Sequence, residues 1–339
     1  MQRRILSLVA IGLALVSSLF AQNKKVLVLS RMGPESFKRM QAAAPNVTLI
    51  QGDRQSAPQQ IMDVDGVIGP LQPALALKAP KLKWIQIESA GAEAFTFTPG
   101  FAQTNITLTN CKIIQGPEIA DHALGLLLAL TRGINVAIRA MSKEEWPTQS
   151  YADHVIELRG KTAVVIGVGG IGTQIALRAH AAGMTVIGVD PKDIPYTSYL
   201  AKTVPPDELD SVIPLADVVF ISAPLTQQSL KMMGAREFEL MKQNSYFIAV
   251  SRGRLYDMDG LVKALDSKKL AGAAVDVTDP EPLPKGHALW KFPNVIVTPH
   301  IAGKSDHEFD RDEDLFIENL KRFAADKPLL NIVDKAKGY

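Results

Sequence analysis

A chain of 339 residues, 47% of them hydrophobic, is long enough to build two domains that each have a buried core. Its formal net charge of +2, with both signs evenly mixed, excludes the strongly basic surface that nucleic-acid binding requires. A single cysteine, Cys111, excludes a disulfide framework and a structural zinc site built from cysteines. The histidines follow no metal-binding spacing, so we expect no metal.

The first 21 residues have the pattern of a secretory signal peptide. Arg3 and Arg4 precede an uncharged apolar run that ends in the small residue Ala21, where cleavage is expected. Paired arginines at this point are also typical of the twin-arginine route, which exports folded proteins. We therefore predict a periplasmic or secreted protein, which would touch the membrane only through an uncleaved leader. A cytoplasmic protein with a wrongly chosen start codon is the alternative.

Short apolar runs alternate with helix-like segments after the leader. Their spacing predicts a small α/β domain with a parallel sheet and without a nucleotide fingerprint. The predicted strands span 25–30, 47–51, 66–69 and 82–88, and a helix is predicted near 36–44.

A long helical pattern runs from Gly116 to Met141. Its central part is apolar on nearly every side, which predicts burial between domains or subunits. Asp121, His122 and Arg132 interrupt the pattern and argue against a membrane span. We interpret His122 as a structural residue of this helix.

Residues 161–190 contain a dinucleotide-binding fingerprint in its full structural context. A strand-like run leads into a glycine pattern, and a helix-like segment follows it. Gly167 permits the tight turn, Gly169 leaves room for the pyrophosphate, and Gly172 lets the helix pack closely on the strand. The phosphates would lie at the helix N-terminus, which favours an anion.

An acidic residue, Asp190, ends the next apolar run, where a carboxylate can bind the ribose hydroxyls. Because it would repel a 2′-phosphate, NAD is predicted rather than NADP. Further strands are predicted at 216–222, 245–251, 271–277 and 294–298, and a last helix near 308–325. Strands that alternate with helix-length segments after a fingerprint predict a doubly wound parallel sheet.

We therefore predict an α/β protein of two Rossmann-like or flavodoxin-like domains, both with doubly wound parallel sheets. The signal peptide is assigned to residues 1–21 and the NAD-binding domain to 116–300. Because the tail is expected to return to the first domain, the substrate (catalytic) domain is discontinuous, with residues 22–115 plus 301–339.

Three polar residues follow predicted strands of the second domain: Arg252, Glu281 and His300. Each alone has an ordinary explanation, as an exposed arginine, a solvated glutamate or a capped histidine. At one sheet edge beside a dinucleotide they suit the reduction of a 2-keto acid. Arg252 would hold the carboxylate and polarise the carbonyl. His300 would donate the proton, or remove it in the reverse direction, and Glu281 would stabilise the imidazolium.

Several motifs, in their order along the chain, resemble those of the D-isomer-specific 2-hydroxyacid dehydrogenase family, and its glyoxylate/hydroxypyruvate reductases in particular. The likeness covers nearly everything after the leader. It rests on the fingerprint, Ser251–Gly253, Asp276–Val277 with Glu281–Pro282, Thr298–His300, the substrate-loop segment Ser89–Ala92 and the adenosine-side segment Ala223–Thr226.

The resemblance implies further roles. Substrate would be bound by Ala90, Gly91, Arg252 and His300, and Asp276 would contact the nicotinamide carboxamide. Cofactor contacts are implied for Gly167, Gly169, Gly170, Ile171, Gly172, Asp190, Ala223, Pro224, Val250, Arg252, Asp276, His300 and Gly303. It also implies a homodimer through the cofactor domain and the 116–141 segment, and glyoxylate, hydroxypyruvate or pyruvate as typical substrates.

Two positions depart from the family pattern. Ala249 stands where the family usually has asparagine, three places before the catalytic arginine, which removes a loop-ordering side chain. Asp121 stands where glutamate is usual, a milder change.

Two other functions compete with the dehydrogenase. A catalytically silent NAD-binding sensor or scaffold would keep the fold, but the intact set of Arg252, Glu281 and His300 argues against it. A formate or phosphite dehydrogenase is the third hypothesis. Formate oxidation would favour glutamine in place of Glu281, so the sequence speaks against it.

Overall fold

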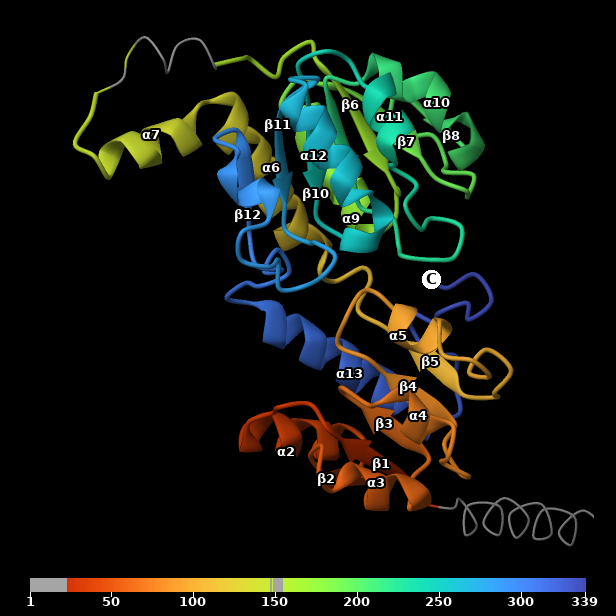
Figure 1. Ribbon diagram of the computed structural model, residues 1–339. Coiled ribbons are helices and arrows are strands. Elements are labelled where there is room, and N and C mark those ends of the chain that lie inside the picture. The colour runs from red at the N-terminus through yellow and green to blue at the C-terminus, as the bar shows by residue number, and fades with distance from the viewer. Residues whose placement is uncertain (1–22, 147, 149–154) are drawn as a thin grey trace, which may run out of the picture. The chain divides into compact units, whose positions relative to one another are not determined.

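The computed structural model describes residues 23–146, 148 and 155–339. The predicted leader and its cleavage point after Ala21 lie outside these residues, so export stays a prediction. The chain divides into two compact units, each built on a parallel sheet (Figure 1). The predicted α/β class with two doubly wound sheets is confirmed.

The smaller unit comprises residues 23–88, 103–109 and 313–332. Its five-stranded sheet has the order β2-β1-β3-β4-β5. Its elements are β1 (Lys24–Val28), α2 (Pro34–Ala43), β2 (Val47–Gln51), α3 (Ala57–Gln60), β3 (Gly66–Ile68), α4 (Pro73–Ala76), β4 (Trp84–Gln86), β5 (Thr107–Thr109) and most of α13 (Glu308–Ala324). The three-residue strand β5 was not predicted.

Helix α13 is held on the smaller sheet by both apolar and polar contacts. The ring of Phe323 lies 4.9 Å from that of Trp84, which is fully buried. The Asn319 amide donates to Gln86 Oε1 at 2.8 Å, and both side chains are buried. The chain thus returns to this sheet after building the other unit.

The larger unit comprises residues 89–102, 110–312 and 333–339, and its seven-stranded sheet has the order β12-β11-β10-β9-β6-β7-β8. Its strands are β6 (Thr162–Ile166), β7 (Thr185–Val189), β8 (Lys202–Val204), β9 (Val218–Ile221), β10 (Ser245–Ala249), β11 (Leu270–Val275) and β12 (Val295–Val297). Its helices are α5 (Glu93–Thr96), α6 (Gly116–Thr131), α7 (Ile134–Met141), α9 (Gly170–Ala181), α10 (Leu209–Val212), α11 (Ala235–Leu240) and α12 (Met258–Asp266). The polar strand β8 was not predicted.

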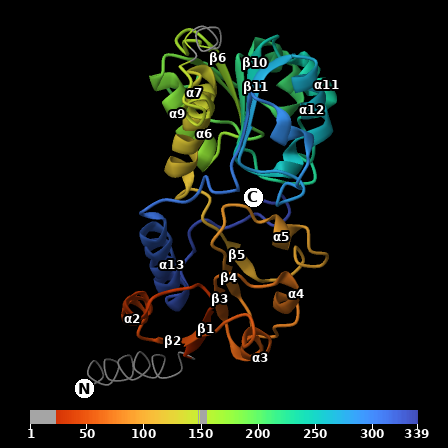
Figure 2. The ribbon, with the colours of Figure 1, turned by 60° about the vertical axis from the view of Figure 1, so that its left-hand side comes forward.

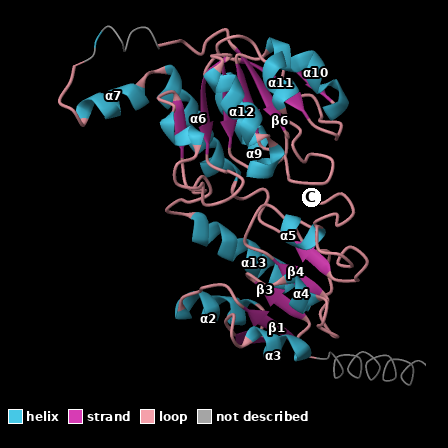
Figure 3. Cartoon of the chain, in the orientation of Figure 1, coloured by secondary structure: helices cyan, strands magenta, loops and turns pink. Residues whose placement is uncertain are grey.

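Both faces of the larger sheet are buried, because successive strand residues point to opposite sides. Val164 packs in the core under α10, α11 and α12, whereas its neighbour Val165 packs under α6 and α9. Figure 2 shows these two helix layers on either side of the sheet, and Figure 3 separates helices from strands by colour. The near-continuous apolar strands of the sequence are explained by this double coverage.

The long helix predicted over 116–141 is wrong as a single element. It breaks between α6 and α7, which meet at a bend of 71°. Gly133 lies between them in the left-handed region, with φ 65°, where glycine ends a helix at little steric cost. In the described part of the chain, no single helix is long and apolar enough to span a membrane; only this bent pair jointly reaches that length and composition.

The predicted domain boundaries, 22–115 plus 301–339 and 116–300, stay predictions. The contacts within the chain group residues 89–102, 110–115, 301–312 and 333–339 with the larger unit. The larger unit therefore contains all the predicted site residues, including the substrate-loop glycine Gly91.

Candidate active site

The strand order of the larger sheet changes direction at β6. Strands β7 and β8 extend the sheet on one side of β6, and β9 to β12 extend it on the other. In parallel sheets ligands bind beyond the carboxyl ends of the strands at such a switch point. All the predicted catalytic and cofactor residues of the fingerprint domain follow strands at this edge.

The fingerprint turn between β6 and α9 is shaped by its glycines. Gly167 has φ +88°, and a Cβ there would lie 2.5 Å from Ala223 Cα. A Cβ on Gly172 would lie 1.8 Å from the Gly167 carbonyl oxygen, so the helix approaches the strand too closely for any side chain. Around Gly169 a Cβ would meet nothing within 4 Å, which leaves open space at the start of α9. The turn thus fits a pyrophosphate.

Asp190 directly follows β7 and lies beside the fingerprint turn. One carboxylate oxygen accepts from the Val168 amide at 2.8 Å, and the other accepts from the Lys192 amide at 2.9 Å. The carboxylate is thus anchored beside the glycine turn, where a ribose bound to that turn would present its hydroxyls. Together with the open side of Gly169, it fits a dinucleotide.

The other predicted cofactor residues lie along the same edge. Ala223 and Val250 are buried directly beyond β9 and β10, and Pro224 is exposed. Gly170 begins α9, and Ile171 and Gly303 are half-buried.

Asp276, predicted to contact nicotinamide, holds the loop after β12. Its side chain is 2% exposed, and one oxygen accepts from the Thr298 hydroxyl at 2.6 Å and the Ile301 amide at 3.0 Å. The other oxygen accepts from the Ala302 amide at 2.9 Å. This carboxylate therefore fixes the backbone that carries His300.

His300 and Glu281 form a close pair. Nδ1 of His300 lies 2.8 Å from Glu281 Oε2, and both side chains are exposed. His300 has φ +54°, and its amide donates to the Asp276 carbonyl at 2.8 Å. The other Glu281 oxygen accepts from the Thr278 amide at 3.1 Å. Both members of the pair are therefore positioned by the main chain that follows β11 and β12.

Arg252 is held by a residue that the sequence analysis did not identify. Its Nε donates to Glu93 Oε1 at 2.5 Å, and its Nη1 donates to the Ser251 carbonyl at 2.7 Å. Both side chains of this ion pair are less than one quarter exposed. The only available signal was the position of this acid, two residues after Gly91 in the substrate loop.

Gly91 allows the close approach of the substrate loop to Arg252. A Cβ on Gly91 would lie 2.2 Å from Arg252 Nη2. The loop is fixed by Ser89, whose hydroxyl donates to the Gly91 carbonyl at 2.6 Å, and by Asn110, whose amide donates to the Ala90 carbonyl at 2.6 Å. The predicted substrate residues Ala90, Gly91 and Arg252 are thus brought together.

His122 also lies closer to this site than its interpretation as a structural helix residue implies. Its Nε2 lies 3.0 Å from the Thr298 hydroxyl and 3.6 Å from Asp276. The sequence pattern of α6 contains no signal for this contact, which joins residues 176 positions apart.

The two departures from the family pattern are accommodated locally. Ala249 is fully buried at the end of β10, and its carbonyl accepts from the Asp276 amide at 2.8 Å. Asp121 accepts from Arg178 Nε at 2.6 Å and so links α6 to α9. Within the described ranges, no three His, Cys, Asp or Glu side chains group closely enough to hold a metal ion.

Known proteins are similar to this chain in sequence. The model of the D-isomer specific 2-hydroxyacid dehydrogenase NAD-binding domain matches residues 124–302. A glyoxylate reductase of Thermofilum pendens is 33% identical over 248 residues, which cover 71% of this chain and 72% of that protein. A glycerate dehydrogenase of Methylorubrum extorquens is 30% identical over 274 residues, which cover 78% and 83%.

Solved structures of related proteins have the same fold as this chain. A D-isomer specific 2-hydroxyacid dehydrogenase of Xanthobacter autotrophicus, in complex with NADPH, shares the fold with a TM-score of 0.80 at 24% identity, over 94% of this chain and all of that one. A glyoxylate/hydroxypyruvate reductase of Sinorhizobium meliloti, in complex with NADP and sulfate, has a TM-score of 0.78 at 25% identity, over 93% and 100%. The chain therefore belongs to the D-isomer specific 2-hydroxyacid dehydrogenase family, whose NAD-binding domain it carries.

Proposed function

We propose that the protein transfers a hydride between nicotinamide and the C2 carbon of a small D-2-hydroxy acid or 2-keto acid. The observation that carries the proposal is the contact of His300 Nδ1 with Glu281 at 2.8 Å, on the same sheet edge as Arg252. A histidine held in this way is equipped to act as a general acid and base. The bound dinucleotide supplies the hydride.

His300 would move the proton. Because Nδ1 faces Glu281, Nε2 is the nitrogen that would face the substrate oxygen. In the reducing direction the imidazolium donates its proton from Nε2 to that oxygen, and Glu281 stabilises the positive charge beforehand. In the oxidising direction the neutral ring accepts the hydroxyl proton.

Arg252 would orient the substrate. Its contacts with Glu93 and Ser251 use two of the five N–H donors of the guanidinium. The donors on the Nη atoms, next to Gly91, suit the planar carboxylate of the acid. With the main-chain amides of Ala90 and Gly91, they would hold the carboxylate and leave the carbonyl facing His300.

The preferred cofactor is proposed to be NAD. The Asp190 carboxylate, anchored on the Val168 and Lys192 amides, would accept hydrogen bonds from the ribose hydroxyls and repel a 2′-phosphate. The Xanthobacter and Sinorhizobium structures contain NADPH and NADP, so the ratio of activities with the two cofactors is a direct test.

Glyoxylate and hydroxypyruvate are the proposed substrates, with pyruvate as a third, in line with the relatives named glyoxylate reductase and glycerate dehydrogenase. The experiment follows NADH absorbance with a panel of 2-keto acids, using the chain from Gln22, and runs His300→Ala in parallel. Oxidation of NADH by one small acid, lost in the variant, supports the proposal. Binding of NADH without turnover of any acid would support the catalytically silent sensor instead.

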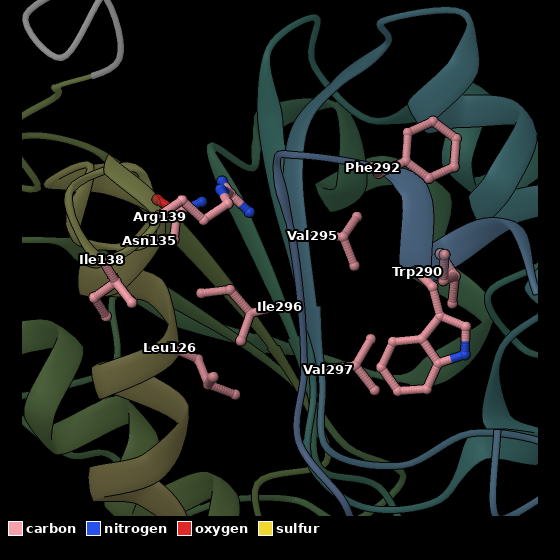
Figure 4. Close-up of a pocket in the computed structure, with 11 residues that line it drawn as sticks. Leu126, Asn135, Ile138, Arg139, Trp290, Phe292, Val295, Ile296 and Val297 are labelled. Atoms are coloured by element: carbon pink, nitrogen blue, oxygen red, sulfur yellow. The ribbon is translucent and has the colours of Figure 1, made fainter. Parts of the chain in front are cut away.

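We also propose a homodimer that uses the groove between helices α6 and α7 and residues 289–297, which include strand β12. An open groove of about 430 Å³ lies there, lined by apolar side chains that include Leu126, Ile138, Trp290 and Ile296 (Figure 4). Asn135 and Arg139 of α7 donate to the Pro293 carbonyl and keep the helix against this groove. Ile138 is 60% exposed and Trp290 is 52% exposed, so a second copy would bury apolar surface that is costly to leave in water.

The dimer is tested by mass measurement in solution. Ile138→Asp is expected to halve the mass found by light scattering, because it puts a charge into the proposed interface. Met62→Asp, at an apolar residue 47% exposed in the smaller unit, is the matched control and should leave the mass unchanged. A full-length protein that already has the monomer mass would refute the dimer.

We further propose that residues 1–21 direct export, with the twin-arginine route as the candidate pathway. The support is the sequence pattern alone: Arg3 and Arg4, the apolar run and Ala21. Cell fractionation of the full chain beside Arg3→Lys with Arg4→Lys tests it. Export of the unchanged chain with cytoplasmic retention of the double variant supports the route, and a cytoplasmic location of the unchanged chain refutes export.

A further inference from the structure

Residues 333–339 form a compact turn that belongs to the larger unit. The Asp334 carboxylate accepts from the amides of Ala336 and Lys337 at 3.0 and 3.1 Å. The Gly338 amide donates to the Asp334 carbonyl at 2.8 Å, and Gly338 has φ +88°. Val333 is 3% exposed. The 333–339 turn is thus closed by its own hydrogen bonds and anchored at its start.

The 333–339 turn touches two loops at the cofactor edge. Lys192 Nζ lies 4.7 Å from the centre of the Tyr339 ring, and Lys192 is two residues beyond Asp190. On the other side, a Cβ at Gly338 would lie 3.1 Å from the Thr226 methyl group. The turn therefore contacts the loop after β7 and the loop after β9.

Those two loops flank the fingerprint. Strands β9 and β7 are the immediate neighbours of β6 in the sheet, one on each side. A dinucleotide whose pyrophosphate lies on the turn after β6, and whose ribose is bound by Asp190, has its adenosine between these loops. The 333–339 turn thus reaches from one wall of the adenosine region to the other.

The chemistry of Tyr339 suits contact with an adenosine. Burial, together with the carboxylates of Asp190 and Asp334, raises the pKa of the Tyr339 phenol, so the ring is uncharged at neutral pH. The Lys192 ammonium lies over it and orients it. A neutral aromatic ring held in one orientation is a stacking surface for a nucleobase.

Asp190 is positioned independently of this tyrosine. Both of its oxygens accept from main-chain amides, those of Val168 and Lys192. A ribose can therefore use the carboxylate while the turn stays in place. This favours a turn that covers the adenosine over one that displaces it.

We propose that the 333–339 turn is a strap over the adenosine half of the dinucleotide site, and that Tyr339 contacts the bound cofactor and slows its release. The strap acts on binding alone, because the reacting groups follow β10, β11 and β12 at another part of the edge. The proposal depends on the dinucleotide site and not on the identity of the acid that is reduced.

The test compares the full chain with Tyr339→Ala, with Tyr339→Phe as the conservative variant and Lys337→Ala as the control at an exposed position of the same turn. Stopped-flow fluorescence measures the release of NADH into excess NAD. Release from Tyr339→Ala is expected to be faster by roughly tenfold or more, the effect of losing one base–aromatic stack. Tyr339→Phe and Lys337→Ala should release NADH at the unchanged rate.

Binding of two fragments of the cofactor, ADP-ribose and nicotinamide mononucleotide, distinguishes the proposed strap from a general loss of structure in the variant. Calorimetry with ADP-ribose should show the same weakening in Tyr339→Ala, whereas binding of nicotinamide mononucleotide should be unchanged. At saturating NADH, kcat should also be unchanged. Tighter NADH binding by Tyr339→Ala would show that the turn blocks the site, and equal weakening of both fragments would show a merely structural role. Either result overturns the proposal.

Discussion

The two sheets of this protein share a plan but differ in the connection that leaves their first strands. In each, the first strand lies inside the sheet and pairs with the second: β1 is flanked by β2 and β3, the second and third strands of its sheet, and β6 by β7 and β9, the second and fourth. In the smaller sheet, the five residues 29–33 connect β1 to α2, whereas 167–169 connect β6 to α9. Only the short connection makes a glycine turn that presses a helix against its strand.

The acids after the second strands differ in the same way. Asp53, beyond β2, accepts from the Ser56 amide at 2.8 Å, the Ser56 hydroxyl at 2.9 Å and the Gln55 amide at 2.9 Å, and these bonds hold its pKa below the ordinary value. Asp190, beyond β7, reaches back 22 residues to the amide of Val168. The same fold thus uses one acid to close its own turn and another to bind the turn of a neighbouring strand, and the tight turn after β6 makes the difference.

The largest effect is expected from removing the proposed general acid and base of the larger unit. His300→Ala should lower kcat by about 10²- to 10⁴-fold, the usual loss for a general acid or base. NADH affinity, measured by fluorescence, should be retained. His180→Ala, at an exposed position of α9, is the control and should keep full activity. If kcat fell no further in His300→Ala than in this control, the proposed role of His300 would be wrong.

The second prediction compares glycine substitutions at the β6–α9 and β1–α2 connections. Gly172→Ala puts a methyl group 1.8 Å from the Gly167 carbonyl oxygen, so the helix must move, at about 1–3 kcal/mol of unfolding free energy. NADH binding should weaken with it. Gly33→Ala, at the N-cap of α2 after the longer connection, meets nothing within 4 Å and should cost about 1 kcal/mol or less. Urea unfolding compares the two, and equal losses would contradict the difference drawn between the turns.

The two acids provide the third comparison. Asp190→Ala should shift the ratio of kcat/KM for NADH over NADPH by about tenfold or more toward NADPH, or about 1.4 kcal/mol, because a repelling charge is removed. Asp53→Ala should leave this ratio unchanged, since its carboxylate binds only its own turn. An unchanged ratio in Asp190→Ala would remove the argument for NAD preference.

A smaller effect is expected at the ion pair of Arg252 and Glu93. Glu93→Gln keeps an oxygen for Nε but removes the charge that partly neutralises the guanidinium. The KM for the keto acid should fall a few-fold, with kcat nearly unchanged. Glu35→Gln, which breaks a surface ion pair with Lys38 in α2, is the control. A rise in KM in Glu93→Gln would mean that the charge helps substrate binding.

The smallest effect concerns the smaller unit, where Lys25 and Lys81 lower the pKa of Asp63 from 3.8 to about 2. A depressed pKa contributes stability above the unfolded value of 3.8, and this contribution is lost as the pH falls through about 2. Asp63→Asn should therefore be slightly less stable than the unchanged chain at pH 7, and the difference should vanish near pH 2. Urea titrations at both pH values test this, and a difference that persists at pH 2 contradicts it.

Much of the fold and site follows from the sequence, because local patterns determine local structure. The strand Val47–Gln51 has the predicted bounds. The glycines of the fingerprint mark a turn that other residues cannot adopt, and the pattern of apolar strands and intervening helices implies a parallel sheet. Since the carboxyl ends of parallel strands share one edge, residues such as His300 and Glu281 could be assigned to one site without knowledge of their distance.

Only the tertiary structure decided which distant side chains meet. Arg252 pairs with Glu93 across 159 positions of sequence, and His122 meets Thr298 across 176. The position of Tyr339 near Lys192 likewise depends on packing. A contact between remote segments is set by how whole elements pack, and the residues on either side carry no local pattern that specifies the partner. The sequence thus determined the sheet edge and its chemistry, and the packing determined how each group at that edge is held.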